Sequence, residues 1–248
     1  MNAREETRWR VVLTLSSVTY RTLSCECYHA LKKAILHLDL PPGMPLDEGQ
    51  LAQQLGTSKT PVREALAQLA GEELVVAGPA RKTYVAPLSI DRVREIYQVR
   101  IMLESSSIRD VTPLLTAEEL DELAAMVRRS KEALVSGDFP TFTDANQRFH
   151  LSLIEKSGNQ LLIAIMRRLF DQARRVSAAL FRVERETEKP SVLNRGVDHH
   201  EAILDALRAR SADRASEAIR LDIQSSLDGV MTPQMQEAFR KLEYRPEN

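Results

Sequence analysis

The sequence lacks the means to be held together by covalent bonds. Its 248 residues include only two cysteines, Cys25 and Cys27, which are separated by a single residue. This spacing cannot build a disulfide framework, and no further cysteine is present to complete a zinc site of thiolates. We expect both thiols to be reduced and to lie on a helix, as is usual in a reducing compartment.

Long apolar runs are absent as well. No run approaches the ~18 apolar residues that a membrane helix needs, and residues 11–18 are too short and too polar for the core of a secretory signal. Because 43% of the residues are apolar, the chain can still bury a substantial core, and its length suits two domains. These features predict a cytoplasmic protein with no membrane partner.

An excess of positive charge, which would indicate a nucleic-acid partner, is also missing. The formal net charge is −1, and residues 21–90 contain as many basic as acidic side chains. Any DNA binding must therefore depend on where the cations lie. Most of the basic residues of this region fall in one short stretch, as Lys59, Arg63, Arg81 and Lys82.

That stretch, residues 46–85, has the pattern of a helix-turn-helix. Asp47 is suited to cap a first helix, and Gly56 can take the positive φ that ends it. Ser58 or Thr60 would begin a second helix, with Pro61 in its first turn, where a missing N–H costs little. The residues expected to be buried on the second helix are Val62, Ala65, Leu66 and Leu69.

A wing is predicted directly after these two helices. Residues 74–77 and 83–85 are β-prone and flank a turn that carries Arg81 and Lys82. A hairpin with a basic tip in this place is typical of winged-helix DNA-binding domains. The residues expected to face DNA are Ser58, Lys59, Thr60, Arg63, Arg81 and Lys82.

The rest of the chain reads as helix. Residues 1–20 show no period and are expected to form an arm, and a helical pattern from Leu23 to Leu38 opens a DNA-binding domain that spans residues 21–88. Residues 89–242 carry six or seven helical patterns and no strand pattern, followed by a tail at 243–248. The first of these helices is expected to bury Val93, Ile96, Val99, Met102 and Leu103. The predicted fold is mainly α: a winged helix-turn-helix followed by an all-α bundle.

Several motifs taken together resemble the GntR family of transcription regulators. Residues 58–66 resemble the recognition-helix signature of that family, and residues 42–46 resemble its lead-in. Residues 99–104, 148–150, 158–159 and 200–207 resemble the FadR-type branch, which has a C-terminal, all-helical FCD ligand domain. The resemblance covers the chain from about Leu23 to Leu227.

The resemblance implies a homodimeric, effector-responsive regulator, usually a repressor, that binds a palindromic DNA operator. It implies that Arg63 and Lys59 contact DNA and that the wing enters the minor groove. Two positions depart from the family pattern: Lys59 replaces the usual arginine, and Gly49 stands where an arginine often touches DNA. A lysine cannot offer a guanine the bidentate fork of an arginine, so the operator sequence is expected to differ.

The resemblance also implies a metal site. In metal-binding members of the family, the position four before the histidine matched by His150 is an acidic or amide ligand, here Asn146; a later helix supplies His200, and a further position, usually histidine, is Asp222. A helix break near Ser211 would bring His200 and Asp222 to one level. These donors suit a divalent metal, zinc first, with nickel or manganese as alternatives. The alternative is an ordinary polar network without metal.

Two roles are considered for Arg100. It can pair bidentately with the carboxylate of a small organic-acid effector, or it can form a salt bridge with Glu104 one helical turn away.

Two other functions are weighed against DNA regulation. Asp198, His199 and His200 match the tripeptide of the DHH phosphoesterases, but that motif needs a preceding strand and further Asp and His clusters, and no such pattern is visible. The other is a ligand-sensing interaction module that has lost DNA binding, which the departures at Lys59 and Gly49 would permit. The sequence favours a regulator rather than an enzyme.

Overall fold

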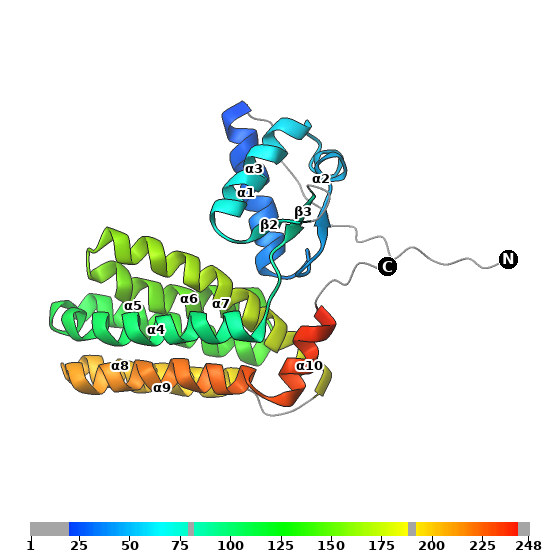
Figure 1. The fold of residues 1–248 in the computed structure, drawn as a ribbon. Helices are drawn as coiled ribbons and strands as arrows, with labels where there is room; N and C mark the ends of the chain where they lie inside the picture. The colour runs from blue at the N-terminus through cyan, green and yellow to red at the C-terminus, as the bar shows by residue number, and fades with distance from the viewer. Residues whose placement is uncertain (1–19, 79–81, 188–191, 243–248) are drawn as a thin grey trace. The chain divides into compact units, whose positions relative to one another are not determined.

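The computed structural model describes residues 20–78, 82–187 and 192–242, which form two compact units (Figure 1). One unit extends to Ala86 and the other begins at Pro87. The arm expected at residues 1–20 lies outside the described residues except for Tyr20, as do Arg81 and the tail expected at 243–248.

The first unit is a winged helix-turn-helix. Its elements are α1 (Tyr20–Leu36), β1 (Pro45–Leu46), α2 (Glu48–Gln54), α3 (Lys59–Gly71), β2 (Val75–Ala77) and β3 (Thr83–Val85). The central strand of the sheet is β3, which pairs antiparallel with both β1 and β2. The sequence did not predict β1, in which Pro45 lies opposite Tyr84. Proline is tolerated on such an edge strand because it need not donate to the ladder.

Local signals account for the turn between α2 and α3. The Asp47 side chain caps α2 by accepting a hydrogen bond from the backbone N–H of Gln50 at 2.8 Å. Gly56 has a φ of 64°, a conformation that costs glycine least. Ser58 precedes α3 without a side-chain capping bond, so this helix start is set by the turn and by Pro61 rather than by the hydroxyl.

The core of the first unit unites α1, α2, α3 and the sheet. The expected face of α3 is buried, and it packs with Leu31, Ile35, Leu51, Leu55, Leu74 and Val85. The helix α1 ends at Leu36 rather than at the predicted Leu38. Leu38 has a φ of 62°, which takes the chain out of the helix while the side chain stays buried.

The second unit is all-helical. Within the described residues its helices are α4 (Ile90–Val111), α5 (Ala117–Ser136), α6 (Phe139–Lys156), α7 (Gln160–Thr187), α8 (Val192–Arg208), α9 (Ala212–Val230) and α10 (Pro233–Leu242). Figure 1 shows α8 and α9 side by side, and α4 packs against α6, α7 and α9. The predicted fold class is confirmed. None of the helices in the described ranges is both long and apolar enough to cross a bilayer.

The buried face of α4 is only partly the one that the sequence predicted, since Val93 and Ile96 are buried as expected. Val99 and Met102 are exposed, by 39% and 69%, whereas Arg100 and Glu104 are buried. Counting apolar residues misplaced the later part of this face because there the side of α4 that packs into the unit carries Arg100 and Glu104. These charged groups belong to the candidate site.

Candidate DNA-reading helix and buried metal centre

The polar residues expected to face DNA gather at the start of α3. Ser58, Lys59, Thr60 and Arg63 are all exposed, and Pro61, Val62, Ala65 and Leu66 between and after them are buried. The helix thus presents donors and cations on one side and packs its apolar side into the core. Lys82 is exposed just before β3, and Arg81 lies outside the described residues.

The wing is closed tightly beside Lys82. The Gly78 N–H donates to the Lys82 carbonyl at 2.8 Å. A Cβ on Gly78 would lie 2.4 Å from Cε2 of Tyr84, so only glycine fits under this ring without a shift.

Arg63 is held by an acidic residue that sequence analysis did not single out. Its Nη2 donates to Glu48 Oε2 at 2.7 Å, and its Nε lies 3.1 Å from both carboxylate oxygens. These hydrogen bonds hold the pKa of the Glu48 carboxyl below its usual range. The contact joins α2 to α3 across 15 residues of sequence, which no local pattern reveals.

In the second unit, three of the four expected metal ligands come together. His150 on α6, His200 on α8 and Asp222 on α9 are all buried. His150 Nε2 lies 3.1 Å from His200 Nε2 and 3.3 Å from Asp222 Oδ2, and His200 Nε2 lies 3.8 Å from Asp222 Oδ1. The hairpin of α8 and α9 places His200 beside Asp222, as their spacing around Ser211 predicted.

Glu104 completes the cluster and was missed as a member of it. Its Oε2 accepts from His150 Nδ1 at 2.7 Å, and its Oε1 accepts from Arg100 Nε at 2.8 Å. A carboxylate on the far nitrogen of a histidine fixes the tautomer and ring orientation of a metal ligand. The sequence showed only the i, i+4 relation of Arg100 and Glu104, because the contact with His150 depends on how α4 packs against α6.

Burial and neighbouring charges act in opposite directions on these groups. Burial alone would lower the pKa of His150, but the charges and hydrogen bonds of Glu104 and Asp222 raise it to about 9. Burial lowers the pKa of His200 to about 4, with Asp222 opposing this only in part. Burial would raise the pKa of Glu104 and Asp222, yet the surrounding cations lower both.

A small cavity adjoins the cluster. It has a volume of about 30 Å³ and is lined by Arg100, Asn146, His150 and Phe170, together with neighbouring residues of α6 and α7. Asn146 is half-buried, and its side chain makes no hydrogen bond within the described part of the chain. The guanidinium carbon of Arg100 lies 5.0 Å from the centre of the Phe170 ring. Arg100 thus makes the predicted salt bridge to Glu104 and still faces the cavity.

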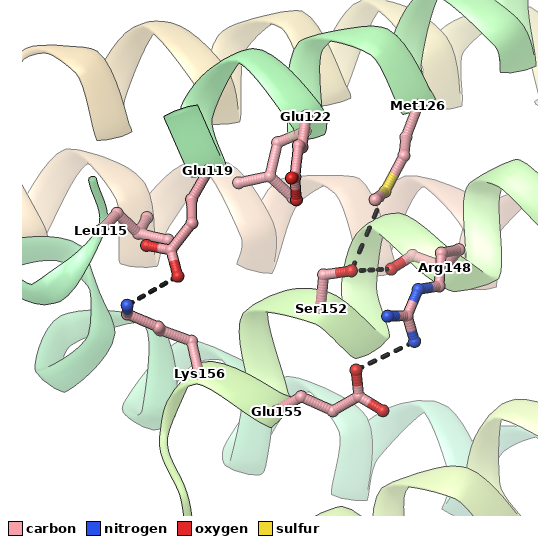
Figure 2. Close-up of a pocket in the computed structure, with 9 residues that line it drawn as sticks. Leu115, Glu119, Glu122, Met126, Arg148, Ser152, Glu155 and Lys156 are labelled. Atoms are coloured by element: carbon pink, nitrogen blue, oxygen red, sulfur yellow. Dashed lines mark hydrogen bonds and ion pairs between the residues drawn. The ribbon is translucent and has the colours of Figure 1, made fainter. Parts of the chain in front are cut away.

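A larger hollow of about 300 Å³ lies elsewhere on the unit, between α5 and α6 (Figure 2). Four of its five charged groups form two ion pairs, Lys156 with Glu119 at 2.7 Å and Arg148 with Glu155 at 2.9 Å. These pairs lie at the surface and leave no convergent set of donors. The candidate site is therefore the smaller, buried cluster.

The DHH tripeptide does not form a catalytic group. Asp198, His199 and His200 all lie on α8, where successive side chains point in different directions. Asp198 is exposed and only His200 joins the buried cluster. The arrangement does not support hydrolysis.

A winged helix-turn-helix with exposed cations on its second helix, joined to a helical unit with a buried polar centre, defines a two-domain DNA-binding regulator. Comparisons with known proteins give the family. Residues 23–85 match the family described as bacterial regulatory proteins, gntR family, and residues 95–225 match the FCD domain. The chain belongs to the GntR family of transcription regulators, in the FadR-type branch with an FCD domain.

Individual relatives agree along most of the chain. An uncharacterized HTH-type transcriptional regulator from an unstable DNA locus of Streptomyces ambofaciens is 30% identical over 85% of this chain and 86% of its own length. The HTH-type transcriptional repressor RspR of Escherichia coli is 26% identical over 83% of this chain and 87% of its own. The solved structure of Escherichia coli McbR/YncC superposes with a TM-score of 0.69 at 26% identity, covering 84% of this chain and 95% of that one. The family and these relatives are regulators of transcription rather than enzymes, and the chain is a DNA-binding regulator.

Proposed function

We propose that this regulator is a cytoplasmic repressor that binds a palindromic operator as a homodimer. Its effector would be a small carboxylate that coordinates a bound divalent metal. One observation carries the metal and effector part: three lone-pair donors converge in the buried cluster. Because His150 Nδ1 faces Glu104, its Nε2 faces His200 Nε2 and Asp222. Two imidazole nitrogens and a carboxylate oxygen this close together need either a hydrogen or a metal ion between them. The hydrogen is a proton on His150 Nε2 or the N–H of neutral His200 in its Nε2 tautomer, and a metal ion would replace it.

The distances suit a metal ion. Tetrahedral zinc with ligands at 2.0–2.1 Å requires donor atoms about 3.3 Å apart, and the two closest pairs here are 3.1 and 3.3 Å apart. His150, His200 and Asp222 would hold the ion, and Asn146 is the fourth candidate from the adjoining cavity. Nickel or manganese would accept the same imidazole and carboxylate donors. The ion would supply a Lewis acid for an oxygen of the effector.

The charges explain why the effector is expected to be an anion. Glu104 and Asp222 have lowered pKa values and Arg100 keeps its charge. A divalent ion added to these three groups leaves one positive charge in excess. A monocarboxylate in the Arg100-lined cavity would balance it and could accept further N–H bonds from the guanidinium.

The direct test is elemental analysis of protein purified without chelator or affinity tag. We expect about one metal ion per chain, and loss of the ion in His150→Ala. The control is His199→Ala, which alters the neighbouring histidine outside the cluster and should keep the metal. Metal well below one-tenth per chain, unchanged after incubation with zinc, nickel or manganese, would reject the site.

The effector is then sought by a thermal-shift screen of carboxylic acids with and without metal. A ligand at a hundredfold excess over its dissociation constant stabilises the native state by about 2.7 kcal/mol. We expect a shift that needs both the metal and Arg100, so that Arg100→Lys weakens it. A carboxylate that stabilises the metal-free protein equally well would contradict the coordination.

The repressor and operator parts of the proposal rest on the first unit and on the relatives. Ser58, Lys59, Thr60 and Arg63 form an exposed polar surface on α3, with Lys82 beside the wing and Arg81 expected at its tip. RspR is named a repressor. We expect the full chain to bind a selected operator tightly and to release it when the effector is added. Direct titration with genomic fragments that finds no preferred sequence would favour the interaction-module alternative.

The homodimer is proposed through the helical unit. Most apolar side chains of α7 are buried within the unit, but Leu161 and Ile165 are 72% and 41% exposed, and Met102 on the neighbouring α4 is 69% exposed. A symmetric interface that covers these side chains would join two chains. The second chain would then supply the DNA-binding unit for the other half of a palindromic operator. Sedimentation should show a dimer that Met102→Asp or Leu161→Asp weakens. Val135→Asp, at an even more exposed position on α5 (86%), should leave the dimer intact. A monomer at micromolar concentration, both free and on DNA, would reject this part.

A further inference from the structure

The contact between Glu48 and Arg63 is the least expected feature of the DNA-facing surface. A carboxylate on that surface is unfavourable for phosphate contact, yet Glu48 lies directly against the arginine expected to read DNA. The geometry is a fork, with Nε and Nη2 of Arg63 both donating to the carboxylate at 2.7 to 3.1 Å. The side chains are 66% exposed for Arg63 and 32% exposed for Glu48.

This ion pair does little for the stability of the fold. Solvent screens an exposed pair, and ordering two long side chains offsets most of the Coulomb attraction. Its effect is therefore on where the guanidinium lies rather than on whether the unit folds.

The pair leaves one edge of the guanidinium available. An arginine has five N–H donors in a rigid plane, and Glu48 takes one from Nε and one from Nη2. Both hydrogens on Nη1 and the second on Nη2 remain, and together they form an end-on fork. This fork matches the O6 and N7 acceptors of a guanine in the major groove. An arginine that is already oriented loses less side-chain entropy when it binds.

Lys59 adds to this arrangement through Gly49. A Cβ at Gly49 would lie 3.3 Å from Lys59 Cε and 3.5 Å from its Nζ. The end of the lysine side chain therefore lies beside the backbone of α2 at Gly49, close to Asp47. The Lys59 ammonium lies near the acidic start of α2, where its charge also acts on Glu48.

We propose that Glu48 is a positioning residue for operator recognition, which holds Arg63 so that its free edge reads one guanine in each half-site. The proposal rests on DNA binding by α3. Glu48 itself need not touch DNA. Its negative charge lowers the affinity for DNA phosphate in general, while its hold on Arg63 raises the discrimination at one base pair.

The experiment uses the full chain and an operator selected by the wild-type protein from a random duplex pool. Dissociation constants are measured for that operator, for every single-base variant of one half-site, and for a scrambled duplex, at several salt concentrations. The variants are Glu48→Gln, Arg63→Ala, the double variant, and Glu64→Gln. The last removes one negative charge from α3 and leaves the Glu48–Arg63 pair in place.

Glu48→Gln is expected to lower the preference for the operator over the scrambled duplex about tenfold, the discrimination typical of one bidentate contact. The loss should fall on one base pair of the half-site. In the Arg63→Ala background the same change should have no further effect on discrimination, because the residue that Glu48 positions is absent. Glu64→Gln should change the dissociation constants of all duplexes by the same factor.

Each other result rejects the proposal. If Glu48→Gln raises the affinity for all duplexes by the same factor, Glu48 only repels phosphate. If its effect on discrimination adds fully to that of Arg63→Ala, Glu48 acts through other groups. Thermal unfolding of Glu48→Gln checks folding, and Glu48→Asp, which keeps the charge on a shorter arm, serves as a second variant with an intermediate loss. Failure of the wild-type protein to select any sequence would instead reject the proposed function.

Discussion

The two units each contain an arginine–glutamate ion pair, and the two pairs lie in opposite environments. Glu48 and Arg63 meet at the surface of the first unit, whereas Arg100 and Glu104 are 7% and 0% exposed in the second. The chemistry is the same, a guanidinium on a carboxylate at 2.7 to 2.8 Å. What differs is the cost of breaking the pair.

At the surface, water replaces a lost partner. In the interior nothing does, so removing one member of a buried pair leaves an uncompensated charge. The buried pair is also part of a longer chain, Arg100 to Glu104 to His150 to Asp222, in which each group holds the next. The exposed pair can therefore be tuned for specificity, while the buried network must be complete to be tolerated.

The largest effect is expected from breaking the buried network. Glu104→Ala should destabilise the second unit by about 3–5 kcal/mol, which corresponds to a fall in melting temperature of about 10 °C. The measurement is thermal or urea unfolding at neutral pH. Glu217→Ala is the matched control, because Glu217 pairs with Arg220 on the exposed side of α9 and should leave the melting temperature nearly unchanged. Equal effects of the two changes would remove the distinction between buried and exposed pairs.

A pH series sharpens the comparison. The pKa of His150 in the folded chain is about 9, above its unfolded value of about 6.5. Its contribution to stability is therefore fully present below pH 6.5 and is lost as the pH rises through about 9. The pKa of His200 is about 4, below the unfolded value, so its burial destabilises the fold as the pH falls from about 6.5 to 4. In chelator-treated protein the melting temperature should be highest near pH 6.5, because the His200 contribution falls below that pH and the His150 contribution falls above it.

Metal should change this profile in a defined way. A bound ion takes the place of the proton on His150, so saturating zinc should remove the loss of stability on the alkaline side. Because the proton competes for the site, metal affinity should fall with decreasing pH already below about 9. His150→Gln should lack the alkaline loss with or without zinc. An alkaline loss that persists in this variant would assign it to another group.

A smaller effect, confined to binding, is expected for Arg63→Ala. Affinity for the selected operator should fall about tenfold to a hundredfold and specificity should relax at one base pair. Unfolding of the free protein should be almost unaffected, because the Arg63 side chain is 66% exposed and its ion pair with Glu48 is screened by solvent. An electrophoretic or fluorescence titration with operator and scrambled duplex tests this. A uniform loss over all sequences would make Arg63 a phosphate contact.

The smallest effect is the stability change on breaking the exposed pair. Glu48→Gln should leave the melting temperature within the error of the measurement, although it removes an ion pair with a 2.7 Å contact, as short as the 2.8 Å contact between Arg100 and Glu104. A fall as large as that of Glu104→Ala would show that Glu48 supports the fold, and the comparison between the two units would fail.

Local signals in the sequence were sufficient for most of the architecture. Asp47 and Gly56 set the turn between α2 and α3, and the Thr116 capping box at the start of α5 is present with both of its hydrogen bonds. Such signals involve a few neighbouring residues, and hydrophobic periodicity is a property of one helix or strand. Both can therefore be recognised in the sequence alone. The pairing of His200 with Asp222 belongs to this class, because one tight connection at Ser211 sets the register of two adjacent helices.

Contacts between elements distant in sequence were decided only by tertiary structure. The C-terminal part of the buried face of α4 was misjudged because Arg100 and Glu104 lie inside, where they pair with each other and Glu104 also accepts from His150, 46 residues away. The same holds for Glu48, which meets Arg63 only because the turn brings α2 against α3. A charged side chain is expected to be exposed to water, because burying it without partners is costly. Only the packed structure shows which buried charges have partners that compensate this cost. Periodicity therefore determined where the helices lie, and packing decided which of their polar side chains form a site.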